Sequence, residues 1–153
     1  MGSVHFRASK RIDASASAVW QTATDWAAHS RWVPLTTVTI TSDAGGLGTR
    51  FIGRTALGRM GFDDPMTVTL WQPPAGPADD AACTVTKTGR LLTGTAGFTI
   101  TAHGEGACTL EWFEDVDIAP RWLTAPLGRV IAALAAPGLH RTLGKLAADV
   151  PRT

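Results

Sequence analysis

Two charged residues interrupt apolar rows in this sequence and are the first candidates for chemistry. Glu114 follows Leu110 and Trp112 at every second position, and Lys87 follows Val85 in the same way. Because side chains alternate along a strand, each charge would share a face with its apolar neighbours. A carboxylate in an apolar pocket has its pKa raised by desolvation, which suits a general acid or base. We therefore predict Glu114 and Lys87 as the catalytic candidates.

Other interpretations of these two residues stay open. Glu114 could lie at the open end of its strand and meet water, or it could contact a ligand without catalysing a reaction. Lys87 could run along the wall of a pocket and expose its ammonium group. If both side chains point inward, they could pair with each other or bind a polar group of a ligand.

The remaining polar residues favour structural roles. Asp63 and Asp64 are adjacent, and neighbours on a strand face opposite ways, so a turn or a strand start is expected rather than a catalytic pair. The four histidines have no partner four positions away and no cysteine nearby, so we expect no metal site and no cofactor. For His29 we expect a hydrogen bond to the backbone. Nucleotide-binding and nucleophile motifs are absent from the sequence.

The elements that would position these residues follow from the apolar periodicity. Alternation and β-branched runs predict strands at 4–12, 36–42, 49–57, 64–72, 82–91, 94–103 and 107–118. Two short helices are expected within 16–33, with Ser17 capping the first and Thr24 or Asp25 capping the second. A long final helix is expected from about Thr124, with a kink at Pro137.

This order predicts an α+β protein with a curved, seven-stranded antiparallel sheet. The apolar face of such a sheet must be covered, and the C-terminal helix is the only element long enough to do so. A bent sheet wrapped around one helix leaves a gap that suits a ligand. The two short helices after the first strand would then form a lid over that gap.

The residues predicted to line this pocket share the apolar face of the strands, the lid, or the apolar stripe of the final helix. They are Trp32, Phe51, Met66, Val68, Leu70, Val85, Phe98, Ile100, Leu110, Trp112, Leu127, Ile131 and Leu134. Trp20 is expected in the core instead. A bulge would move part of a strand's residues to the other face. Flat aromatic walls would favour a planar ligand.

Length and composition limit the remaining possibilities. The 153 residues fit a single domain spanning 1–153. A net charge of +1 gives no strong field for nucleic acid or an anionic membrane, and without a long apolar run we expect no stable membrane insertion. Cys83 and Cys108 are far apart and are expected as buried free thiols, which favours a cytoplasmic location. The oligomeric state is not predicted.

Several segments resemble the START-like (SRPBCC) superfamily, which has the helix-grip fold. They are IDASASAVW at 12–20, TDWAAHSRWVP at 24–34, GLGTRF at 46–51, CTLEWFEDVDI at 108–118 and the closing helix. The superfamily includes polyketide cyclases and dehydratases, lipid carriers and plant hormone-binding proteins. The resemblance implies an apolar pocket between sheet and helix, but no fixed set of catalytic residues.

Three functions are compatible with this architecture. The first is binding of a small hydrophobic molecule that is lipid-like, polyketide-like or aromatic. The second is a polyketide cyclase, aromatase or dehydratase that holds a flexible substrate in a folded shape with one acid or base assisting. The third is a protein-interaction module with a collapsed pocket. The predicted inner face is poor in Ser, Tyr and Arg, which favours binding over catalysis.

Overall fold

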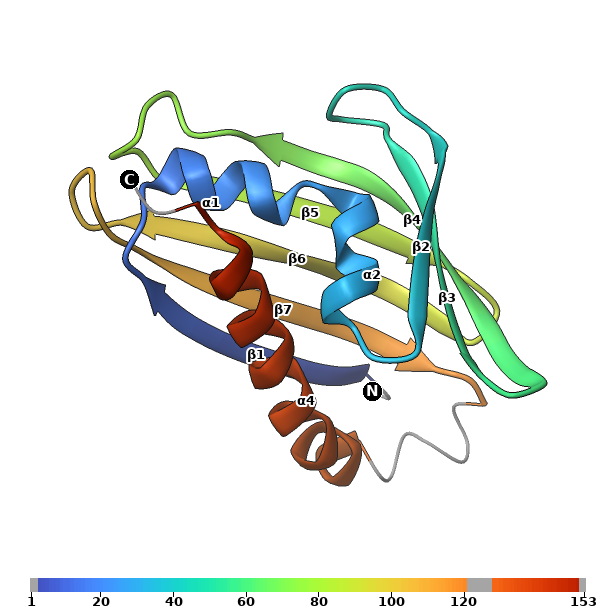
Figure 1. Ribbon diagram of the computed structural model, residues 1–153. Helices are drawn as coiled ribbons and strands as arrows, with labels where there is room; N and C mark the ends of the chain where they lie inside the picture. The colour runs from blue at the N-terminus through green and yellow to red at the C-terminus, as the bar shows by residue number, and fades with distance from the viewer. Residues whose placement is uncertain (1–2, 121–127, 152–153) are drawn as a thin grey trace.

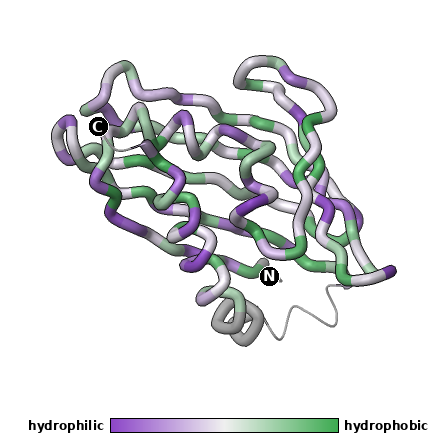
Figure 2. Tube along the Cα trace, in the orientation of Figure 1, coloured by the Kyte–Doolittle hydropathy of each residue, from purple (hydrophilic) through white to green (hydrophobic). Residues whose placement is uncertain are grey.

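The computed structural model describes residues 3–120 and 128–151, and of Ser3 and residues 128–134 it describes the backbone only. Seven strands form one curved antiparallel sheet in the order β1-β7-β6-β5-β4-β3-β2 (Figure 1). The strands are β1 (Ser3–Ile12), β2 (Thr36–Ser42), β3 (Arg50–Leu57), β4 (Met60–Gln72), β5 (Ala81–Thr88), β6 (Leu92–Ala102) and β7 (Cys108–Ile118). Apolar and polar residues alternate along them (Figure 2), as a sheet with one covered face requires.

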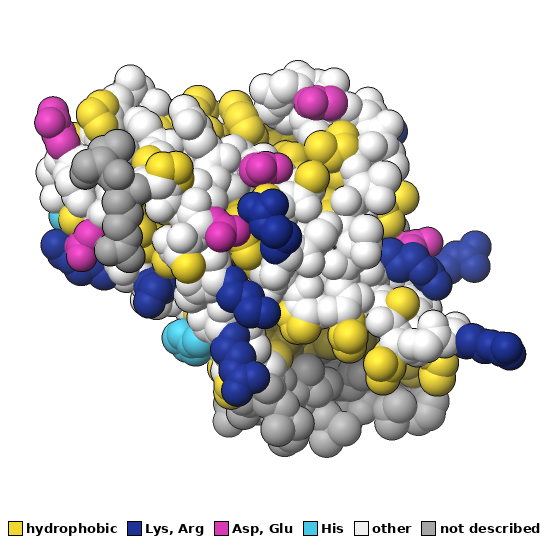
Figure 3. All heavy atoms as spheres, viewed as in Figure 1, with side chains coloured by type: hydrophobic (Ala, Val, Ile, Leu, Met, Phe, Trp, Pro, Cys, Tyr) yellow, Lys and Arg dark blue, Asp and Glu magenta, His cyan; other side chains and the backbone are white. Residues whose placement is uncertain are grey.

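The helices in the described part of the chain all lie on one face of this sheet (Figure 1). They are α1 (Ala16–Ala23), the 3-10 turn η1 (Trp26–Ala28), α2 (His29–Trp32) and α4 (Gly128–Asp149). The predicted α+β helix-grip architecture is confirmed: a curved sheet of seven strands, two short helices after the first strand, and a long C-terminal helix. Figure 3 shows basic and acidic side chains on the same face of the molecule, with hydrophobic side chains between them.

Helix α1 and the 3-10 turn η1 begin at side-chain caps, one of which differs from the prediction. Ser15, not Ser17, caps α1: its backbone is extended and its hydroxyl oxygen accepts a hydrogen bond from the Ala18 N–H at 3.1 Å. Ser17 lies within the first turn, where its side chain cannot take that position. Asp25 is a cap as predicted, but of the 3-10 turn η1: its carboxylate accepts from the Ala28 N–H at 3.3 Å, and α2 itself has no side-chain cap.

A β-bulge in β4 overturns one predicted orientation. The pairing of β4 with β5 shifts register between Val68 and Leu70. The extra residue reverses the faces beyond it, so Leu70 is 37% exposed and Trp71 turns inward instead. The Trp71 ring meets the Trp20 ring edge-on, with centroids 4.9 Å apart. Leu70 is therefore not a pocket residue, and Trp20 is in the core as expected.

The C-terminal helix covers the sheet with the apolar stripe that follows Pro137. Leu143, Leu146 and Val150 are almost completely buried, and α4 packs against β1. Pro137 lies inside α4, where it cannot donate to the carbonyl of Ala133. The predicted start near Thr124 falls outside the described residues. No helix in the described part of the chain is long and apolar enough to cross a membrane.

Candidate functional site

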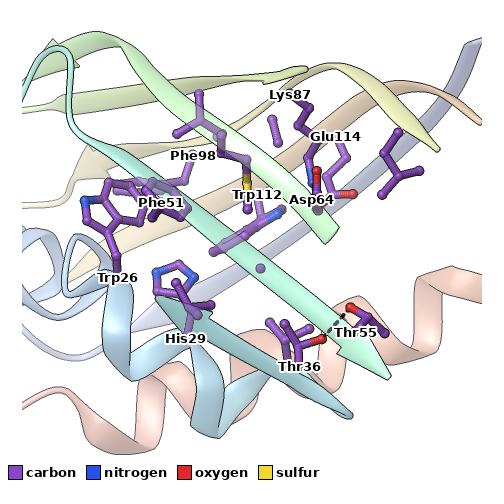
Figure 4. A pocket seen from close by; sticks show the side chains of 18 of the residues that line it. Trp26, His29, Thr36, Phe51, Thr55, Asp64, Lys87, Phe98, Trp112 and Glu114 are labelled. Carbon is purple, nitrogen blue, oxygen red and sulfur yellow. Dashed lines mark hydrogen bonds and ion pairs between the residues drawn. The ribbon is translucent and has the colours of Figure 1, made fainter. Parts of the chain in front are cut away.

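A cavity of about 220 Å³ lies between the covered face of the sheet, from β2 to β7, and the segment formed by η1 and α2 (Figure 4). Its wall is formed by Trp26, His29, Val33, Thr36, Val38, Phe51, Gly53, Thr55, Phe62, Asp64, Met66, Cys83, Val85, Lys87, Leu92, Ala96, Gly97, Phe98, Trp112 and Glu114. Aromatic rings make one end of it, and charged side chains make the other (Figure 4).

The register of the sheet brings these residues together. Met66 of β4 lies opposite Phe51 of β3 on one side and Lys87 of β5 on the other. Cross-strand neighbours point to the same face, so these three side chains all enter the cavity. In the next row, Val85 of β5 lies opposite Ala96 of β6.

Small residues on β6 let Lys87 of β5 approach Glu114 of β7. Gly94 lies opposite Lys87, and Ala96 lies opposite Glu114. Neither residue fills the space between the two charged side chains. Gly94 has φ +134°, and a Cβ there would come within 2.2 Å of the Asp115 carbonyl oxygen. A larger residue at this position would require the backbone to shift.

The aromatic end is built by the lid and β3. Trp26 stacks on Phe51 with ring centroids 4.5 Å apart and planes 17° apart. His29 lies between this pair and the opposite wall, 5.3 Å from the Trp26 ring and 5.5 Å from the Trp112 ring. The planes of His29 and its two neighbours are tilted by 39° and 47°, so the flat part of this apolar wall is the stacked Trp26–Phe51 pair.

His29 is neutral and serves as a structural hydrogen-bond donor. Its Nε2 lies 2.8 Å from the carbonyl oxygen of Ala23, which can only accept, so Nε2 carries the ring proton. Burial lowers the pKa of His29 from 6.5 to about 4, despite the hydrogen bond to Ala23 and the charge of Asp25. The predicted backbone hydrogen bond is confirmed. At neutral pH this imidazole has no acidic proton to give to a substrate.

The charged end is a buried group of three side chains, here called the Lys87 cluster: Asp64, Lys87 and Glu114. The Lys87 ammonium lies 2.5 Å from Asp64 Oδ2 and 3.9 Å from Glu114 Oε1. Lys87 and Asp64 are 6% and 7% exposed, whereas the Glu114 side chain is 26% exposed. Burial lowers the pKa of Lys87, but the charges of Glu114 and Asp64 and the Asp64 hydrogen bond together raise it above its usual value. Lys87 is therefore a cation stabilised by two carboxylates, and it does not serve as a general base.

Two buried polar atoms of the cavity residues have no hydrogen-bond partner. They are Oδ1 of Asp64 and Nε1 of Trp112. Among the described side chains, no other buried nitrogen or oxygen atom lacks a partner. An unpaired buried polar group costs about 1–3 kcal/mol. A donor and an acceptor left unpaired at one cavity are what a polar ligand group could satisfy.

Two threonines form a smaller polar spot on the β2–β3 side. Thr36 Oγ1 donates to the Pro34 carbonyl at 3.0 Å and lies 2.8 Å from Thr55 Oγ1. Because the single proton of Thr36 is committed to Pro34, Thr55 is the donor in the second bond (Figure 4). The Thr55 hydroxyl then offers only acceptor lone pairs to the cavity.

The cavity contains part of the set predicted from sequence. Seven predicted residues line it: Phe51, Met66, Val85, Lys87, Phe98, Trp112 and Glu114. Val68, Ile100 and Leu110 are buried in the packed core and are not part of the cavity wall. Leu127 falls outside the described residues, as do the side chains of Ile131 and Leu134. Whether any of these residues binds a ligand stays a prediction.

Trp32 was predicted to line the pocket, but it connects the lid to the C-terminal helix instead. It is 1% exposed, yet it lies outside the cavity wall. Its Nε1 donates to Asp149 Oδ2 at 2.7 Å, and its carbonyl accepts from the Thr142 hydroxyl at 3.2 Å. Trp32 thus fastens α2 to α4, and Trp26 is the lid tryptophan that faces the cavity.

Asp64 is the most important residue that sequence reasoning missed. It lies inside β4, because that strand begins at Met60 rather than at the predicted residue 64. The signal was present: Asp64, Met66 and Val68 are in phase at every second position, so they share a face. Reading the alternation back by two residues would have placed the Asp64 carboxylate on the apolar face, whereas its closeness to Lys87 depends on the register between β4 and β5.

Cys83 contributes apolar wall rather than reactivity. Both cysteines are free and buried, as predicted. Burial raises the pKa of Cys83 to about 12, so its thiolate, the nucleophilic form, is scarce at neutral pH. Among the described residues, no group of three or more His, Cys, Asp or Glu side chains is arranged to hold a metal ion.

A second hollow of about 190 Å³ adjoins the first. It lies against α4 and shares Val33, Trp112 and Glu114 with the main cavity, while Gly138 and Leu139 contribute from the helix. Glu114 is thus at the border of both spaces, which agrees with its partial exposure.

Comparisons with known proteins agree on one family. The sequence profile described as polyketide cyclase/dehydrase and lipid transport matches residues 3–151. No curated protein matches the sequence.

Solved structures share the fold at low sequence identity. The Zhui aromatase/cyclase from Streptomyces sp. R1128 superposes with a TM-score of 0.70 at 12% identity, covering 97% of this chain and 96% of that one. A START superfamily protein from Mycobacterium smegmatis gives 0.68 at 16% identity, covering 96% and 97%. Human STARD10 gives 0.70 at 14% identity, covering 95% of this chain and 64% of its own. At such identities, the likeness establishes the fold alone.

Proposed function

Because this chain belongs to the polyketide cyclase/dehydrase and lipid transport family, we propose that it binds one small, mostly apolar molecule that carries an oxygen-bearing group. The observation that carries the proposal is the cavity itself, which has a flat aromatic end and two unpartnered buried polar atoms. Natural ligand sites combine apolar walls with a few placed polar groups in this way.

The volume of the cavity limits the size of the ligand. At about 220 Å³, it is smaller than the roughly 300–1,000 Å³ of pockets that hold drug-sized molecules. A molecule of two or three fused rings, or a short folded chain, fits this range better than a two-tailed lipid. The adjoining hollow against α4 gives room for a substituent that passes Trp112 and Glu114.

The proposal is tested by asking whether a ligand co-purifies and whether filling the cavity removes it. Native mass spectrometry of the purified protein should show a bound small molecule. Ala96→Leu adds volume to the cavity wall and should abolish that species. Thr99→Leu, on the exposed side of the same strand, is the matched control and should retain it. Equal ligand occupancy in a folded Ala96→Leu variant would contradict binding in this cavity.

Catalysis in the same cavity is the second candidate, favoured by the position of Glu114. This carboxylate borders both hollows and lies 3.9 Å from the Lys87 ammonium. Its side chain is exposed enough to exchange protons with water. The Zhui aromatase/cyclase shares this fold. A cyclase or dehydratase would fold a flexible chain against the aromatic end while Glu114 moved one proton. Once a substrate is identified, unchanged turnover in Glu114→Gln would exclude that role.

A further inference from the structure

We propose that this cavity selects a neutral, flat ligand bearing a hydroxyl group, and that it rejects a carboxylate of the same shape. This inference rests on the proposed function, since it concerns what the same cavity binds. It is carried by the charge balance of the Lys87 cluster and by the two unpartnered atoms beside it.

The charge balance of the cavity opposes an anionic ligand. Lys87 is the only Lys or Arg among the described residues of the wall, and its one positive charge already faces Asp64 and Glu114. With both carboxylates ionised, the Lys87 cluster has a net charge of −1. A carboxylate ligand would be a third anion around one ammonium in a poorly hydrated space, where like charges repel strongly.

The unpartnered atoms require both a donor and an acceptor from the ligand. Trp112 Nε1 can only donate, and Asp64 Oδ1, as part of a carboxylate, can only accept. Figure 4 shows the Trp112 indole nitrogen directed toward the end of the cavity that holds Asp64, Lys87 and Glu114. A hydroxyl group both accepts and donates, so it is the simplest group that serves the two kinds of atom. A carboxylate or a ketone only accepts, and would leave Asp64 Oδ1 unpaired.

The threonine pair adds a second acceptor without a second donor. The proton of Thr55 is committed to Thr36, so its hydroxyl offers only lone pairs to the cavity. A ligand hydroxyl can donate to such an oxygen, whereas a carboxylate cannot. The stacked rings of Trp26 and Phe51 favour a flat ring system on the same ligand. Together these features describe a phenol-like molecule.

Three probes of nearly equal shape test the proposal: 2-naphthol, naphthalene and 2-naphthoate. At pH 7 the naphthol is neutral, as a tyrosine phenol is, and the naphthoate is ionised. Binding is followed by NMR through the indole N–H signals. We expect 2-naphthol to bind at least about ten-fold more tightly than 2-naphthoate, and more tightly than naphthalene. We also expect it to shift the Trp112 N–H signal in the direction of a new hydrogen bond.

Variants separate hydrogen bonding from charge. Trp112→Phe keeps a ring but removes the donor, so it should reduce the preference for naphthol over naphthalene, while Trp20→Phe in the core should not. Asp64→Asn removes one negative charge and should raise naphthoate affinity relative to naphthol. If that buried change prevents folding, Glu114→Gln makes the same charge change at a more exposed site.

The outcomes distinguish this inference from the proposed function. Naphthoate binding as tightly as naphthol would overturn the selectivity and leave a hydrophobic binding protein. Binding of none of the three probes, with no ligand in the purified protein, would overturn the proposed function itself. Naphthol binding that is unchanged in Trp112→Phe would overturn the hydrogen-bond part of the argument.

Discussion

Asp64 and Lys87 are 23 positions apart in the sequence, yet the Lys87 ammonium lies 2.5 Å from Oδ2 of Asp64. They come from neighbouring strands, β4 and β5, and both side chains are buried at the cavity. Glu114 on β7 completes the group from across β6. Two carboxylates around one lysine keep that lysine charged inside an otherwise apolar wall. This arrangement stabilises a charge in the wall and underlies the ligand selectivity that we propose.

Breaking this ion pair should be costly. Lys87→Met leaves Asp64 and Glu114 without their cation, and removal of one partner of a buried pair costs about 3–5 kcal/mol. Urea unfolding would measure the loss. Arg54 and Asp63 are the control pair, on β3 and β4, with Nη1–Oδ1 at 3.0 Å and side chains 52% and 58% exposed. Arg54→Met should cost less than about 1 kcal/mol. Equal losses in the two variants would contradict the burial of the Lys87 cluster.

Acid should destabilise the fold through His29. Its pKa is lowered from 6.5 to about 4, so between these values the unfolded chain takes up a proton that the folded chain does not. Above pH 6.5 both states are neutral at this residue, and below about 4 both are protonated. The free energy of unfolding should therefore fall by about 3 kcal/mol as the pH drops from 6.5 to 4.

The variant His29→Gln isolates this contribution. Glutamine can still donate to the Ala23 carbonyl but does not titrate. Chemical unfolding at several pH values should show a flatter profile for His29→Gln than for the wild type in that window. An unchanged slope would mean that His29 is protonated in the folded protein.

Because of the bulge in β4, substituting Trp71 should destabilise the fold more than substituting Leu70. Simple alternation along the strand predicts the reverse. Trp71 turns inward and contacts Trp20, so Trp71→Ala should cost at least about 2 kcal/mol. Leu70 is 37% exposed, and Leu70→Ala should cost less than about 1 kcal/mol. Thermal or urea unfolding of the two variants checks the register. A larger loss for Leu70→Ala would show that the strand continues without the bulge.

Trp32 should control the pKa of Asp149. The hydrogen bond from Trp32 Nε1, followed by that from Arg31, holds the pKa of this carboxyl below its usual value. Trp32→Phe keeps the ring but removes the donor, so the pKa of Asp149 should rise. NMR titration of the carboxyl carbon would measure the change. Arg31→Met removes a second hydrogen bond and a positive charge, so it should also raise this pKa. An unchanged pKa in Trp32→Phe would contradict the bond between α2 and α4.

Much of the fold could be predicted because it depends on local patterns. Period-two alternation gave the seven strands, and helical spacing with Asp25 gave the two-helix lid. The same alternation identified Phe51, Met66 and Val85 as one face of the sheet. Buried strands leave this signal in the sequence because every second side chain must avoid water.

Some assignments failed where one residue changed the phase. The bulge after Val68 moved Leu70 outward, and alternation contains no warning of a bulge. In the lid, a 3-10 turn precedes α2, so Trp26 faces the cavity while Trp32 faces α4. Helical spacing alone does not tell which of two tryptophans faces which neighbour.

The sequence by itself determined the element order, the family resemblance, and the presence of two charged residues, Lys87 and Glu114, on an apolar face. Only the tertiary structure decided that Asp64 completes their charge balance and that Trp112 and Asp64 keep unpaired atoms at one cavity. The physical reason is that charge compensation and hydrogen-bond satisfaction depend on distances between strands. Those distances are set by register and sheet curvature, which no single segment of the chain encodes.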